Sequence, residues 1–67
     1  MNANTPEQIN KMRRKAESLQ RMIVFTFKAG SDPRHIESDL SAVNGWLGRC
    51  TVEELIAADK ALFQEAA

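Results

Sequence analysis

The sequence has little of what builds a catalytic centre, a metal site or a disulfide. Its 67 residues include one cysteine, Cys50, and one histidine, His35. A lone cysteine forms no disulfide within a chain, and these two residues do not complete the ligand set of a structural zinc site. Nucleophilic catalysis needs a base beside the nucleophile and a third group that orients the base, and no such spacing surrounds Cys50. We therefore expect no enzyme activity, no metal and no cofactor.

Long apolar runs and targeting patterns are also lacking. No apolar stretch approaches the roughly 18 residues that a membrane-spanning helix needs. The first residues do not follow the order of basic, apolar and small residues that is typical of signal peptides. We expect a cytoplasmic protein with no membrane partner, in a reducing compartment where Cys50 stays a thiol.

What the chain does have is the composition of a folded domain, with 43% hydrophobic and 27% charged residues. A chain of this length makes a single domain, residues 1–67, and buries a smaller share of its surface than a larger domain does. Small domains usually gain stability from a disulfide, a metal or a partner subunit. Because neither of the first two is expected here, we expect a homodimer.

The first helix is predicted for residues 6–29. Thr5 offers an N-cap hydroxyl, Pro6 suits the first helical position, and Gln8 can complete a capping box. Gly30 can adopt the left-handed conformation that ends a helix. Apolar residues recur every three or four positions and form one stripe, which comprises Ile9, Met12, Ala16, Leu19, Ile23 and Phe27.

A second helix is predicted for residues 33–47, because Asp32 and Pro33 repeat the combination of cap and proline. Its apolar stripe comprises Ile36, Leu40, Val43 and Leu47. The end of this helix stays open at this stage. Asn44 and Gly45 could stop it, or it could continue with weak propensity to Leu47.

A third helix is predicted for residues 52–66, because Thr51 and Glu54 have the spacing of a capping box. Its apolar residues fall on one side, which comprises Val52, Leu55, Ile56, Leu62, Phe63 and Ala66. Asp59 falls in the middle of this side. A carboxylate there needs a partner or an opening to water, because an unpaired buried charge is costly, and Arg13 or Arg21 could supply the partner.

These lengths predict the fold. At about 1.5 Å per residue, helix 6–29 is nearly as long as the other two helices laid end to end. We expect an all-α helical hairpin in which one long helix packs against two shorter ones. The second arm would bend at residues 48–50, and two chains would form a homodimeric helical bundle.

The segment 22–27 predicts where two chains meet. It is apolar nearly all round a helix, so one chain alone is not expected to cover every side of it. The expected dimer interface comprises Met22, Ile23, Phe25 and Phe27.

Charge is divided unequally along a chain whose net charge is zero. Residues 1–30 carry six Lys or Arg and two Asp or Glu, whereas residues 31–67 carry three and seven. Basic residues recur every seven positions on the side of helix 6–29 away from its apolar stripe, with Phe25 among them, and Trp46 lies beside two glycines. The predicted partner-binding residues are Arg14, Arg21, Phe25, Lys28 and Trp46.

The function predicted from these features is binding. We expect a small module that binds and regulates or inhibits another intracellular protein, and its small size suits a phage or plasmid antagonist. The alternative is a transcriptional regulator that binds nucleic acid through the basic face of helix 6–29. A helix-turn-helix that reads DNA with helix 52–66 is disfavoured, because that helix opens with Glu53 and Glu54 where phosphates would lie.

Overall fold

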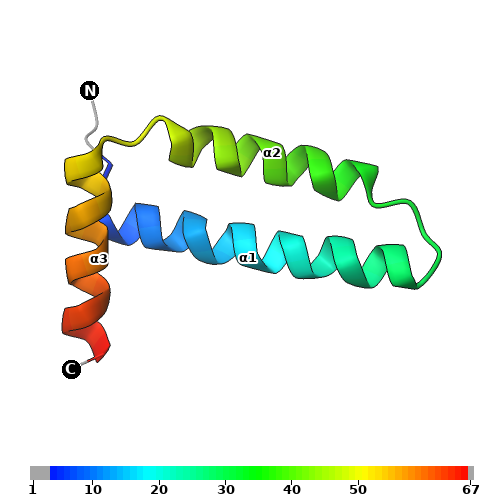
Figure 1. Ribbon diagram of the computed structural model, residues 1–67, viewed down its shortest axis with the longest axis horizontal. Helices are drawn as coiled ribbons and strands as arrows, with labels where there is room; N and C mark the ends of the chain where they lie inside the picture. Colours follow the sequence, from blue (N-terminus) through cyan, green and yellow to red (C-terminus); the bar gives the residue numbers. More distant parts are fainter. Residues whose placement is uncertain (1–3, 67) are drawn as a thin grey trace.

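The computed structural model describes the backbone of residues 4–66 and the side chains of residues 4–64. Within this range the chain forms three α-helices and no strand, so the prediction of an all-α protein is confirmed. Helix α1 is Pro6–Lys28, α2 is Arg34–Gly48 and α3 is Val52–Ala66. Figure 1 shows α1 and α2 side by side and antiparallel, with α3 crosswise at the end where α1 begins.

The caps of α1 form as the sequence predicts. Thr5 Oγ1 accepts a hydrogen bond from the Gln8 backbone N–H at 3.2 Å, and Gln8 Oε1 accepts one from the Thr5 N–H at 3.3 Å. After the helix ends, Gly30 adopts a φ of 81°. This left-handed turn lets the N–H of Ser31 reach back to the carbonyl of Thr26 at 3.0 Å, which satisfies a carbonyl of the last helical turn.

The start of α2 differs from the prediction. The N-cap is Pro33, which has no side chain to cap the helix, and Asp32 lies one residue outside it. The carboxylate of Asp32 instead accepts hydrogen bonds from Nε of Arg34 at 2.8 Å and from its backbone N–H at 3.0 Å. At its other end, α2 continues through Asn44 and Gly45, so these residues do not stop it.

The hydrophobic core lies between α1 and α2. Leu19, Ile36 and Val43 form a buried cluster, and the residues that pack against it are Met12, Ala16, Ile23, Leu40 and Leu47. All of them belong to the two predicted apolar stripes. Phe27 is the exception, because 74% of it is exposed although the stripe of α1 includes it.

Helix α3 does not continue α2 as a second arm of the hairpin. It packs on α1, and within the described range no Cα atom of α3 lies within 8 Å of a Cα atom of α2. Nδ2 of Asn10, which is buried, donates to the carbonyl of Ala58 at 2.9 Å. Ala58 is fully buried, and its small side chain lets the two helix backbones approach closely.

An ion pair also joins α3 to α1. Nη1 of Arg13 lies 2.6 Å from Oδ1 of Asp59, so of the two predicted partners, Arg13 and Arg21, it is Arg13 that pairs with this carboxylate. The side chain of Asp59 is 65% exposed, so this carboxylate has both a partner and access to water. A pair this exposed contributes little to stability.

The first turn of α3 is tied to the start of the chain by Glu54. Its Oε1 accepts the N–H of Thr51 at 2.8 Å, and Thr51 Oγ1 accepts the N–H of Glu54 at 3.1 Å, which completes the predicted capping box. Its Oε2 accepts the N–H of Asn4 at 3.1 Å. These bonds, first that from Thr51 and then that from Asn4, hold the pKa of the Glu54 carboxyl below its ordinary value of 4.5.

We expect acid to remove the stabilisation that Glu54 provides. A lowered folded-state pKa stabilises the fold above the ordinary pKa, and this contribution is lost as the pH falls through the lowered value. Glu54→Gln cannot lose a charge, so its melting temperature should fall less than that of the wild type between about pH 6 and about pH 3. The control is Glu37→Gln, on an exposed residue of α2. Equal acid sensitivity of both variants would contradict this prediction.

Candidate binding surface

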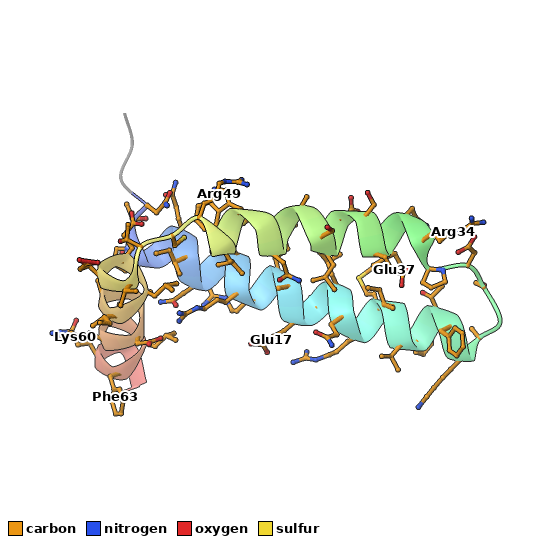
Figure 2. All side chains as sticks on the ribbon, turned by 45° about the horizontal axis from the view of Figure 1, so that its top comes forward. Glu17, Arg34, Glu37, Arg49, Lys60 and Phe63 are labelled. Atoms are coloured by element: carbon orange, nitrogen blue, oxygen red, sulfur yellow. The ribbon has the colours of Figure 1, made fainter. Side chains whose placement is uncertain are left out.

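The side of α1 opposite α2 carries exposed basic residues. Arg14, Arg21 and Lys28 are all exposed, and their spacing of seven places them on one face. Phe25 lies on the same face and is 77% exposed. Figure 2 shows Glu17 on the side of α1 that points away from α2. The ring of Phe25 is thus exposed to solvent between the basic side chains of Arg21 and Lys28.

Arg21, Phe25 and Lys28 lie together on an open, only slightly hollowed face of α1, hereafter the α1 groove, whose remaining lining is Glu17, Gln20 and Val24. Nη2 of Arg21 lies 3.5 Å from Oε2 of Glu17, and the two side chains are 80% and 67% exposed. An ion pair of this length and exposure stabilises the fold little. Arg21 can thus exchange Glu17 for a carboxylate of a partner at small cost.

Arg14 and Trp46 lie in a second groove, lined also by Gln8, Lys11, Met12 and Lys15. Trp46 is half-buried, so only part of its ring is open to a partner. The structure therefore brings together three of the five predicted binding residues, Arg21, Phe25 and Lys28, and places the other two elsewhere.

The residues predicted for the dimer interface do not share one environment. Met22 is 49% exposed, and Phe25 and Phe27 are 77% and 74% exposed. Ile23 is half-buried and packs against the core between α1 and α2. Its side chain already contributes to the fold of its own chain.

Cys50 and His35 lie at opposite ends of α2. With a rise of about 1.5 Å per residue, the helix separates them by about 20 Å, so they do not form a nucleophile and base pair. Sγ of Cys50 instead accepts from Nδ2 of Asn4 at 3.6 Å and donates to the carbonyl of Trp46 at 3.7 Å. Among the described residues, no group of three His, Cys, Asp or Glu side chains could hold a metal ion.

An exposed apolar stripe on α3 was not predicted, because the sequence pattern placed all the apolar residues of this helix on one side. In the structure Leu55 and Ala58 lie on the less exposed side, whereas Val52, Ile56 and Phe63 are 67%, 49% and 82% exposed. These three residues are hereafter the α3 stripe, and Figure 2 shows Phe63 projecting away from the hairpin. Their spacing of four and seven separates them from residues 55 and 58, and this is the signal that could have found them.

Comparison with protein-family models, curated proteins and solved structures finds no match for this chain. No helix in the described part of the chain is long and apolar enough to cross a membrane. What the protein binds is therefore inferred from its own exposed side chains.

Proposed function

We propose that this chain is a protein-interaction module that binds another protein through the α1 groove and thereby regulates or inhibits it. The observation that carries the proposal is Phe25, 77% exposed and lining a groove with Arg21 and Lys28. The partner surface that fits this groove has an apolar pocket for the ring of Phe25 and carboxylates around it. Such a protein would act in the cytoplasm, and its small size suits a phage or plasmid antagonist.

The chemistry of the groove favours a protein partner. Aromatic rings and arginine are enriched among the residues that dominate protein interfaces, because they bury much area and their polar parts bond with defined geometry. The basic residues around Phe25 would attract an acidic surface and speed association. Removing apolar surface from water is favourable, so a partner that covers the ring of Phe25 gains binding free energy.

Nucleic acid fits the groove less well. Phosphate contacts dominate the affinity of proteins for nucleic acid, and a surface that binds it usually carries a large excess of positive charge. The α1 groove offers two basic side chains, Arg21 and Lys28, beside the carboxylate of Glu17. The chain as a whole has no net charge.

The test is affinity capture of the partner from native cells treated with nuclease, followed by binding measurements on the purified pair. Phe25→Ala should weaken binding at least about tenfold, or about 1.4 kcal/mol. Its matched control is Phe27→Ala, because Phe27 is equally exposed and lies two residues further along α1. This control should bind as the wild type does.

Charge reversal adds a second comparison. Replacing Arg21 and Lys28 by Glu should slow association, and matching reversals on the partner should restore it. The control replaces Lys11 and Lys15, which line the groove of Trp46, with the same change in net charge. Should this control abolish binding while Phe25→Ala does not, the site lies at Trp46 and the proposal for the α1 groove is wrong. Capture of nucleic acid, with a steep and log-linear salt dependence, would favour the regulator of transcription.

A homodimer belongs to this proposal, because a chain this small with exposed apolar residues gains stability from a second copy.

A further inference from the structure

Helix α3 is apolar on two sides, and only one of them is covered. The side with Ala58 packs on α1. The other side carries the α3 stripe, Val52, Ile56 and Phe63, and follows the spacing of a coiled-coil seam, in which apolar positions alternate in steps of three and four. Asp59 occupies the remaining seam position, and Arg13 of α1 holds its carboxylate at 2.6 Å.

The chain is more extended and exposes more surface than a compact monomer of its length. Its radius of gyration is 14.1 Å, whereas a compact domain of this length has about 11 Å. Its accessible surface is 5274 Å², against about 4,200 Å² for a folded monomer of 7.5 kDa. The excess of about 1,000 Å² is close to the roughly 800 Å² that each partner buries in an interface of standard size.

The charged residues beside the α3 stripe fit a second copy of α3, and they favour its antiparallel orientation. Glu53 and Lys60 are both exposed and lie seven residues apart, so they are on one flank of the stripe. When two copies of α3 pair antiparallel about a two-fold axis, each flank faces the same flank of the other copy. Glu53 of each chain then lies opposite Lys60 of the other, and the pairing forms twice.

A parallel arrangement lacks this match. There the flank with Glu53 and Lys60 would face the opposite flank of the other copy, which carries Leu55 and Leu62. In the antiparallel arrangement Val52 of each copy also lies opposite Phe63 of the other. Ile56 of each copy then lies opposite Asp59 of the other, whose carboxylate is paired with Arg13 of its own chain.

We infer that the α3 stripe is the homodimer surface of this protein and that it pairs with the α3 stripe of a second copy in antiparallel orientation. This inference rests on the homodimer included in the proposed function, and it leaves the α1 groove open for another protein. A contact through residues 22–27 would instead bring Arg21 and Lys28 of both chains together, and like charges repel.

The first test measures molecular mass against concentration by sedimentation equilibrium of the full chain. The wild type should dimerise at micromolar concentration. Ile56→Glu puts a charge at the centre of the stripe and should raise the dissociation constant at least about tenfold, with the helix content of the monomer unchanged because Ile56 is half exposed. The matched control is Ala57→Glu, an exposed position of α3 turned away from the stripe, which should dimerise as the wild type does.

The second test concerns orientation and uses only exposed residues. Circular dichroism checks that each variant keeps its helix content, because Glu53 lies in the first turn of α3, where a cation is unfavourable. Glu53→Lys alone and Lys60→Glu alone each place like charges opposite one another and should weaken the dimer about fivefold to tenfold. The double variant restores opposite charges in the antiparallel pairing and should recover the dissociation constant of the wild type. Within one chain the two residues are two turns apart, so recovery would come from the other copy.

The outcomes separate this inference from the proposed function, because mass is measured without the other protein. A wild type that is monomeric at every concentration overturns the inference and leaves the α1 groove unaffected. A dimer that survives Ile56→Glu but dissociates when Met22 and Phe27 are replaced by Ser overturns it in favour of the interface predicted from the sequence. Failure of the double variant to recover overturns the antiparallel arrangement.

Discussion

Replacing Ile9 by alanine is expected to unfold most of the chain. Ile9 is fully buried, and it is the largest fully buried side chain in the described part of the structure. Truncating a buried isoleucine to alanine destabilises a protein by about 2–5 kcal/mol, since the fold loses transfer free energy and keeps a cavity. A core in a chain this short rarely supplies more than about 3–5 kcal/mol. The loss from Ile9→Ala can therefore equal the entire free energy of unfolding.

The measurement is urea unfolding followed by circular dichroism, at one fixed chain concentration because a dimer links stability to concentration. The control is Val24→Ala, on the same helix and 49% exposed, which should lower the free energy of unfolding by less than about 1 kcal/mol. If Ile9→Ala and Val24→Ala unfold at the same urea concentration, burial of Ile9 does not provide the expected stability.

Replacing Ala58 by leucine is expected to separate α3 from α1 while the hairpin persists. Ala58 is fully buried, and its carbonyl accepts the 2.9 Å hydrogen bond from Asn10. A larger side chain at this point has no room, and overpacking costs about 1–3 kcal/mol. The hairpin should survive because its cluster of Leu19, Ile36 and Val43 contains no residue of α3.

Amide resonances report this change residue by residue in NMR spectra. Those of α3 and the side-chain amide of Asn10 should shift or broaden, whereas those of α2 should stay in place. Ala57→Leu is the matched control, because Ala57 precedes the buried alanine and is exposed. Uniform loss of the spectrum in Ala58→Leu would mean that the hairpin and α3 unfold together.

The helices could be predicted from the sequence because their signals are local. Thr5 with Gln8, and Thr51 with Glu54, lie three residues apart, and each pair forms the expected capping box. Gly30 ends α1 through its own backbone freedom. The apolar stripes of α1 and α2 also predicted which side chains pack in the hairpin, apart from Phe27, which is exposed, and Ile9, which is buried but outside the cluster between α1 and α2.

The direction of α3 could not be predicted in this way. It depends on pairs far apart in the chain, Asn10 with Ala58 and Arg13 with Asp59, which are separated by 48 and 46 residues. On a helix that is apolar on two sides, such as α3, the periodicity of apolar residues does not predict which side packs on α1. The binding residues were predicted from spacing, but their division between two grooves follows from how α2 lies on α1.

Helices α2 and α3 each pack on α1, and in the described part of the chain neither packs on the other. Local opening of one of them should leave the packing of the other on α1 in place. The two should therefore exchange their amide protons with solvent as separate cooperative units. The amides of α1 that face both neighbours should exchange last, because solvent reaches them only when the entire chain unfolds.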